Sequence, residues 1–310
     1  MEIVEAVLAM LAASVALAVV ARLAGLPYAV VLILGGMALA FAPGVPRVVL
    51  DPALALALFL PPLLMASAWR TDWGAFRRNL RPILLLAVGC VVFTAFAIGA
   101  LAKLLLPELP WAAAIALGAI LAPPDAVAAA AVLARLKLPA RIVTVLEGES
   151  LLNDASALVL YRLAVTAAAA GSVSAWGAVG SFALLGGGGV AVGWALAWAC
   201  NWLMRRLDDT LLEIALSFLA AFASFLLAEA LHLSGVMAVV TTGIAMGRAR
   251  HVTLSARTRL SALAVWQFAE FVLTSLVFIL IGLQLNGILE RVAARGFWEL
   301  AGLAGRCRWA

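Results

Sequence analysis

Charged residues are scarce in this 310-residue sequence: they make up 12% of the chain, whereas 66% of the residues are hydrophobic. A soluble globular domain carries about 25% charged and about 45 to 50% apolar residues. The composition therefore excludes a soluble globular domain, and the high apolar content also excludes a disordered chain. The sequence has only three cysteines, and they lie far apart, at Cys90, Cys200 and Cys307. This spacing predicts neither a disulfide framework nor a cysteine metal site.

Motifs of enzyme chemistry are also missing. The sequence contains no His-Glu-x-x-His, no Gly-x-Ser-x-Gly and no cluster of cysteine and histidine, so we expect neither an enzyme nor a bound cofactor. Its two histidines, His232 and His251, lie apart, near expected helix ends, which favours interfacial positions. The glycine run that starts at Gly186 lacks the ending of a phosphate loop. Within it, Gly189-x-x-x-Gly193 predicts close packing between helices.

Long apolar runs are what the sequence has in abundance. About 20 apolar residues cross a bilayer as a helix, so the runs predict an all-α polytopic membrane protein with ten complete spans. The spans are expected near residues 3–22, 28–43, 52–68, 82–105, 111–134, 149–169, 177–203, 210–230, 234–247 and 260–287.

The basic residues give this topology an orientation. When Lys and Arg are assigned to alternate sides of the ten spans, fourteen fall on one side. The other side holds five, which are Arg47, Lys103, Arg162, Arg291 and Arg295. Since the side rich in Lys and Arg faces the cytoplasm, we predict an inner-membrane protein with its N-terminus outside. The net charge of +5 comes from these short loops, which indicates membrane lipid rather than nucleic acid as the partner.

The fifth run is interrupted at Pro123-Pro124-Asp125. Two consecutive prolines remove helix hydrogen bonds, so we expect two half-helices, with Asp125 capping the second. Broken helices at mid-membrane expose backbone carbonyl and amide groups to a cavity, an arrangement that secondary transporters use for ion sites. The alternative is a simple proline kink with a capping aspartate.

A second polar cluster, Glu147-Gly-Glu-Ser-Leu-Leu-Asn-Asp-Ala155, enters the sixth run. A carboxylate at mid-membrane costs at least about 2.5 kcal/mol, so Asp154 needs a function or a partner. Ser150 and Asp154 are four residues apart, on one helix face, with Asn153 beside them. Their oxygen atoms suit a small cation, and competition of a cation and a proton for Asp154 is the minimal chemistry of exchange. The alternative is a polar face that binds a neighbouring helix.

These motifs resemble those of the sodium/hydrogen exchanger family of monovalent cation:proton antiporters, whose bacterial members include the NhaP type. The resemblance extends over essentially the whole chain. It rests on Pro-Pro-Asp-Ala-Val at 123–127, Glu-Gly-Glu-Ser-Leu-Leu-Asn-Asp-Ala at 147–155, Leu-Pro-Pro-Leu-Leu at 60–64, Ala-Glu-Ala-Leu-His-Leu-Ser-Gly at 228–235 and Ser-Leu-Val-Phe-Ile-Leu-Ile-Gly-Leu at 275–283.

The resemblance implies roles for single residues. Asp154 would carry Na+ or the proton, Asn153 would support it, and the Ser150 hydroxyl would be a further Na+ ligand. Pro124 stands where the family usually has Thr, so a backbone carbonyl is kept and a hydroxyl is lost. Glu149 matches an acid that forms a structural ion pair with an Arg on a later core helix. A family acid of the third helix is replaced by Ala66.

The resemblance also implies an antiporter fold with two inverted three-helix repeats, a broken fifth helix and a homodimer. We expect helices 1 to 3 in residues 1–81, the first core repeat with the ion site in 82–169, and helices 7 to 10 in 170–290. Residues 291–310 would begin an incomplete second repeat. The predicted function is exchange of Na+ (or K+ or Li+) for H+ by alternating access. The alternative is a truncated or non-transporting protein of antiporter ancestry that acts as a binding or assembly partner.

Overall fold

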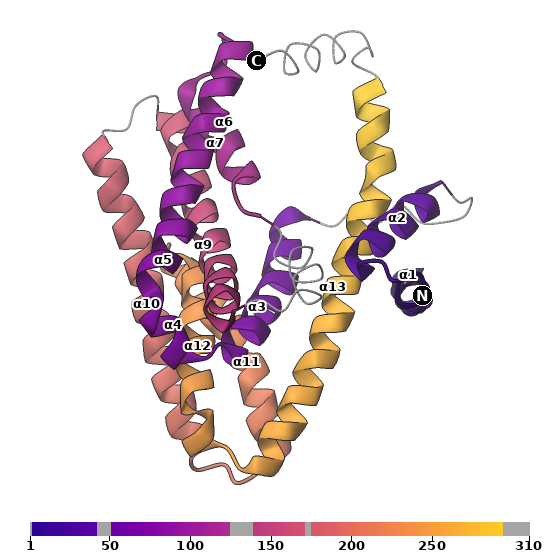
Figure 1. Cartoon of the computed structure of the whole chain (residues 1–310), viewed down its shortest axis with the longest axis vertical. Coiled ribbons are helices and arrows are strands. Elements are labelled where there is room, and N and C mark those ends of the chain that lie inside the picture. Colours follow the sequence, from indigo (N-terminus) through magenta and orange to yellow (C-terminus); the bar gives the residue numbers. More distant parts are fainter. Residues whose placement is uncertain (1, 42–50, 125–138, 171–174, 294–310) are drawn as a thin grey trace. The chain divides into compact units, whose positions relative to one another are not determined.

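A computed structural model describes residues 2–41, 51–124, 139–170 and 175–293 (Figure 1), and its regular elements in these ranges are all helical. They are α1 (Glu2–Ala24), α2 (Tyr28–Ala40), α3 (Pro52–Arg70), α4 (Trp73–Arg78), α5 (Leu80–Leu84), the π-helical segment η1 (Leu85–Cys90), α6 (Val91–Leu105), α7 (Trp111–Leu121), α9 (Ala140–Ala170), α10 (Ala175–Met204), α11 (Thr210–Ala230), α12 (Gly235–Thr253) and α13 (Ala256–Ala293). The predicted all-α class is confirmed.

Each of the ten expected spans coincides at least in part with a described helix. Among the described residues, six helical stretches are long and apolar enough to cross a membrane, and three shorter apolar helices accompany them. Several boundaries differ from the prediction, and two of them are informative. The helix expected from residue 149 already begins at Ala140, because Pro139 directly before it suits a helix start. The helix expected to end at 247 continues to Thr253. Basic residues in its last turn interact favourably with the negative end of the helix dipole.

The fifth span ends as a regular helix at Leu121. Pro123 and Pro124 follow within three residues, and a proline disfavours helical backbone at the residue before it. This end agrees with the predicted break. The expected second half-helix and Asp125, its expected cap, lie outside the described residues.

The described residues between 56 and 267 form one compact unit, which contains most of α3, the described helices from α4 to α12 and the beginning of α13. Small residues let its helices approach closely. A Cβ atom at Gly99 would lie 3.2 Å from the Ala114 carbonyl oxygen, so α6 and α7 are in tight contact. Cβ atoms at Gly189 and Gly193 would clash with backbone carbonyls at the N-terminal end of α12. The predicted packing role of Gly189-x-x-x-Gly193 is confirmed, against α12 of the same chain.

The described parts of residues 1–55 and 268–293 form a second unit, with α1, α2 and most of α13. Here α2 lies directly on α13, because a Cβ atom at Gly36 would be 2.5 Å from the Ile279 carbonyl oxygen. A Cβ atom at Gly282 would likewise be 2.5 Å from the carbonyl oxygen of Ile33. Close backbone approach between transmembrane helices commonly uses such small residues.

Candidate functional site

The polar cluster of the sixth span lies on one uninterrupted helix, α9. Helical geometry places Ser150 and Asp154 one turn apart on the same face, as predicted. Both residues are partly buried, and Asn153 between them has no exposed surface. The structure therefore brings an acid, a hydroxyl and an amide together within two turns of one helix.

Asn153 is held at both ends of its amide. Its Nδ2 donates to Glu149 Oε1 at 3.1 Å, and its Oδ1 accepts from the backbone N–H of Asp154 at 2.6 Å. A buried amide with neither partner would cost about 1–3 kcal/mol, so these bonds fix the side chain in place. In this arrangement Asn153 links Glu149 to the backbone at Asp154, which is a supporting position.

Apolar side chains adjoin the cluster. Leu151, Leu152 and Ala155 belong to the hydrophobic core of the larger unit. Gly148 packs on the preceding helices, because a Cβ atom there would lie 2.6 Å from Ile83 Cδ1 and 3.0 Å from Phe76 Cε2. A carboxylate among such neighbours loses hydration, and a bound cation or proton can compensate for that loss.

The other predicted site residues lie elsewhere or outside the described ranges. Pro124 is exposed just beyond the end of α7, a helix that packs against α9. Asp125 lies outside the described residues. Ala66, at the position of the missing third-helix acid, is buried with 1% of its surface exposed. Within the described ranges, no three or more His, Cys, Asp or Glu side chains are grouped as a metal site would require.

Sequence reasoning missed an ion pair further along α9. Arg162 Nη2 donates to both carboxylate oxygens of Glu229 at 2.9 Å, which joins α9 to α11. Glu229 Oε1 also accepts from the backbone N–H of Gly235, the first residue of α12, at 3.2 Å. From the sequence, Arg162 was counted only among the five basic residues of the outer side. The signal was present, because a charge within an apolar span usually has a partner of opposite sign.

Comparison with known proteins gives a consistent picture. Residues 9–304 match the family described as "Sodium/hydrogen exchanger, transmembrane". An uncharacterized Na+/H+ exchanger of Escherichia coli, YjcE, is 39% identical over 249 residues, which cover 77% of this chain and 45% of that protein. The Na+/H+ antiporter ApNhaP of Aphanothece halophytica is 35% identical over 263 residues, covering 84% of this chain and 50% of that protein. The chain thus spans about half the length of these relatives.

Further matches concern cation range and fold. A sodium, potassium, lithium and rubidium/H+ antiporter of Bacillus pumilus is 36% identical over 262 residues, which cover 82% of this chain and 39% of that protein. The solved structure of the sodium proton antiporter MjNhaP1 from Methanocaldococcus jannaschii aligns with a TM-score of 0.72 at 20% identity. That alignment covers 91% of this chain and 71% of the other, and it confirms the expected antiporter fold.

Proposed function

This chain belongs to the sodium/hydrogen exchanger family, and from that premise we propose that it exchanges Na+, K+ or Li+ for H+ across the cytoplasmic membrane. The observation that carries the proposal is Asp154, partly buried on α9 with Asn153 and Ser150 beside it. The relatives of this chain include proteins named as Na+/H+ antiporters, which supports monovalent cations as substrates.

Asp154 is the proposed carrier. A carboxylate partly removed from water is stabilised by either a cation or a proton, and one group cannot hold both. Release of one and capture of the other on opposite sides of the membrane then couples the two fluxes. Alternating access of the site, as in other secondary transporters with broken helices, completes the exchange.

The neighbours of Asp154 have separate proposed roles. Ser150 lies one turn earlier and offers a hydroxyl oxygen to Na+, while Asn153 holds the local backbone through its two hydrogen bonds. Pro124 would contribute its carbonyl oxygen from the end of α7, and Asp125 would cap the half-helix expected after it. Glu149 bonds to Asn153, and its proposed ion pair with an Arg of a later core helix stabilises the site.

The proposed assembly is a homodimer in the inner membrane, with the N-terminus outside. The membrane setting is supported by the six apolar helical stretches among the described residues. The orientation follows from the bias of basic residues towards one side.

The test uses everted vesicles that contain the 310-residue chain and a dye sensitive to the pH gradient. Addition of Na+, K+ or Li+ should dissipate the gradient in the wild type and not in Asp154→Asn. Glu147→Gln is the matched control, because it removes a charge from an exposed position of the same helix. Exchange that persists in Asp154→Asn, with equal amounts of protein in the membrane, would refute the carrier role.

A second candidate function is a non-transporting binding or assembly partner of antiporter ancestry. Two substitutions favour it: Ala66 replaces a third-helix acid, and Pro124 replaces the usual Thr. Under this alternative the well-inserted wild type shows no exchange of any of the three cations.

A further inference from the structure

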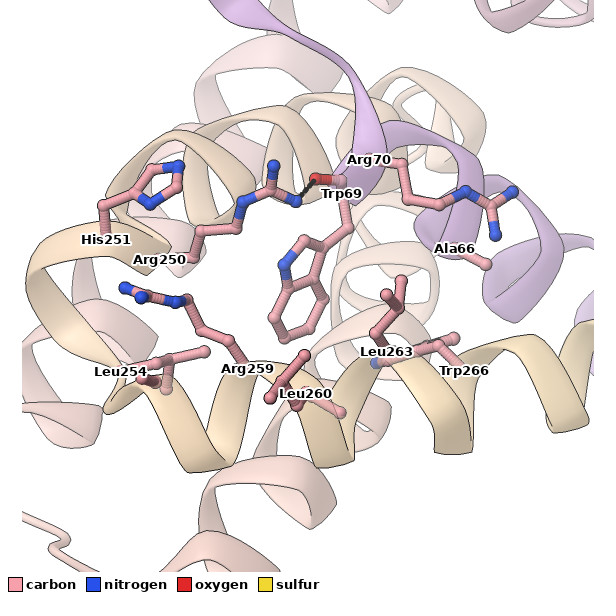
Figure 2. A pocket seen from close by; sticks show the side chains of 12 residues that line it. Ala66, Trp69, Arg70, Arg250, His251, Leu254, Arg259, Leu260, Leu263 and Trp266 are labelled. Carbon is pink, nitrogen blue, oxygen red and sulfur yellow. Dashed lines mark hydrogen bonds between the residues drawn. The ribbon is translucent and has the colours of Figure 1, made fainter.

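The larger unit contains a cavity of about 520 Å³ at the end of α3, beside the last turns of α12 and the first turns of α13 (Figure 2). Arg70 comes from α3, Arg250 and His251 from α12, and Arg259 from α13. We name these four side chains and the space between them the basic pocket. Its volume falls within the range of about 300–1,000 Å³ that is usual for ligand sites.

The basic pocket has charge of one sign. Its lining includes three arginines and a histidine and contains no Asp or Glu. Within the described part of the chain, no carboxylate lies within ion-pair distance of Arg250 or Arg259. Like charges at close range repel one another, more strongly where solvent is partly excluded. An anion in the cavity would relieve that repulsion.

Helix packing places Arg250 in the pocket. Gly243 and Gly247 let α12 lie against the end of α3, because a Cβ atom at Gly247 would be 2.5 Å from the Trp69 carbonyl oxygen. Three residues later, Arg250 Nη1 donates to that same carbonyl at 3.1 Å. A guanidinium carries five N–H donors, so this bond fixes the group and leaves donors for a ligand.

The aromatic wall of the pocket is also rigid. Trp266 stacks on Phe218 with ring centroids 4.0 Å apart, and its Nε1 donates to Ser217 Oγ at 3.1 Å. Trp69 lies next to Trp266, with 6.0 Å between the ring centroids. Figure 2 shows Arg250, His251 and Arg259 on one side of the Trp69 ring and Arg70 on the other.

The beginning of α13 is fixed as well. The Ser255 hydroxyl accepts from the Thr258 backbone N–H at 3.1 Å, as a helix cap does, and Thr258 Oγ1 bonds to Thr210 Oγ1 of α11 at 2.9 Å. Arg259 follows directly after this anchored turn. The positive end of the helix dipole therefore adds to the charge of the guanidinium groups.

We propose that the basic pocket binds a phosphate group, carried either by an anionic phospholipid head group or by a small soluble phosphate. Planar guanidinium forks match phosphate oxygens. Tryptophan is enriched at the membrane interface, and basic pockets between transmembrane helices bind anionic head groups. Leucine side chains complete the lining, at Leu254, Leu260 and Leu263, and offer apolar contact beside the charges.

The test measures thermal stabilisation of the purified full chain in a neutral detergent. Three probes are compared: short-chain phosphatidylglycerol, short-chain phosphatidylcholine and inorganic phosphate. We expect phosphatidylglycerol or inorganic phosphate to raise the unfolding midpoint, and phosphatidylcholine to raise it far less. A rise with inorganic phosphate alone identifies a soluble phosphate as the source, whereas a rise with phosphatidylglycerol alone identifies the lipid.

Variants connect the effect to the pocket. Arg250→Gln with Arg259→Gln should weaken the apparent affinity at least tenfold. The control pair Arg77→Gln with Arg81→Gln removes the same charge from exposed positions of α4 and α5 and should leave the affinity unchanged. Arg259→Gln alone is a second test, because the Arg259 side chain has no hydrogen bond to any described residue and its loss should therefore leave the fold intact.

Three results would overturn the proposal: no stabilisation of the wild type by either anionic probe, equal stabilisation by phosphatidylcholine, or equal loss of affinity in the two variant pairs. The measurement is made on binding and needs no transport. It therefore separates a failure of this proposal from a failure of the proposed exchange.

Discussion

The acidic face of α9 and the basic pocket are opposite in charge and also in how they are assembled. On α9, Glu149, Ser150, Asn153 and Asp154 lie within two turns of one helix. In the basic pocket, by contrast, Arg250 donates to a carbonyl that is 181 residues earlier in the chain. The arrangement of the α9 residues follows from helical periodicity, whereas the basic pocket depends on helix packing.

The two regions also differ in how their polar groups are satisfied. Asn153 is bonded within its own helix, to Glu149 and to the backbone at Asp154. Arg250 is bonded across helices, to the end of α3. Substitutions that disturb helix packing should therefore affect the basic pocket more than the α9 cluster, and the following predictions test that difference.

The largest expected effect is that substitutions in each region abolish one activity and leave the other unchanged. Asp154→Asn should abolish cation/proton exchange and leave stabilisation by the anionic probe unchanged, because the two groups belong to separate sites. Arg250→Gln with Arg259→Gln should do the reverse. Both activities are measured on the same preparations, by vesicle assay and by thermal unfolding. Loss of anion binding in Asp154→Asn would show that the sites are coupled.

Asn153→Ala should lower exchange at least tenfold, although the charge of Asp154 is kept. The variant removes a fully buried amide and leaves Glu149 and the Asp154 N–H without this partner, at a cost of about 1–3 kcal/mol. Ser156→Ala is the control on the same helix, since the Ser156 hydroxyl bonds only to the Leu152 carbonyl among described residues. Equal effects of the two substitutions would contradict a specific role for Asn153.

Gly247→Ala should destabilise the protein by about 1–3 kcal/mol, because the added Cβ atom would press on the Trp69 carbonyl. It should also weaken binding of the anionic probe, because it displaces the Trp69 carbonyl that accepts the hydrogen bond from Arg250. Gly186→Ala is the matched control: it makes the same change on α10, where no described atom other than the adjacent backbone of the same helix lies within 4 Å of the new Cβ atom. Thermal unfolding of both variants checks the prediction, and similar midpoints would exclude tight α3–α12 packing.

The smallest expected effect lies outside both regions. His232 has a φ angle of 57° just after α11, a left-handed conformation that costs a residue with a side chain about 1 kcal/mol. His232→Gly should therefore raise the unfolding midpoint slightly and change neither exchange nor anion binding. His232→Ala keeps the strain and should show no rise. A change in either activity would mean that this turn communicates with one of the two sites.

Much of the fold could be predicted from the sequence. Every expected span coincides at least in part with a helix, because an apolar run long enough for a bilayer forms one. The end of α7 at Leu121 could be predicted from Pro123 and Pro124. The start of α9 at Ala140 was not predicted, because the charges of Arg141, Glu147 and Glu149 interrupt the apolar residues before Ser150.

For the candidate site, too, the sequence predicts what lies within one helix but not the contacts between helices. The juxtaposition of Ser150, Asn153 and Asp154 follows from the helical repeat and could therefore be predicted without the structure. The ion pair of Arg162 with Glu229 and the lining of one cavity by Arg70, Arg250 and Arg259 depend on helix packing and could not be predicted. Glycines that admit close backbone approach decide which helix faces meet, and that choice depends on side chains far apart in the chain.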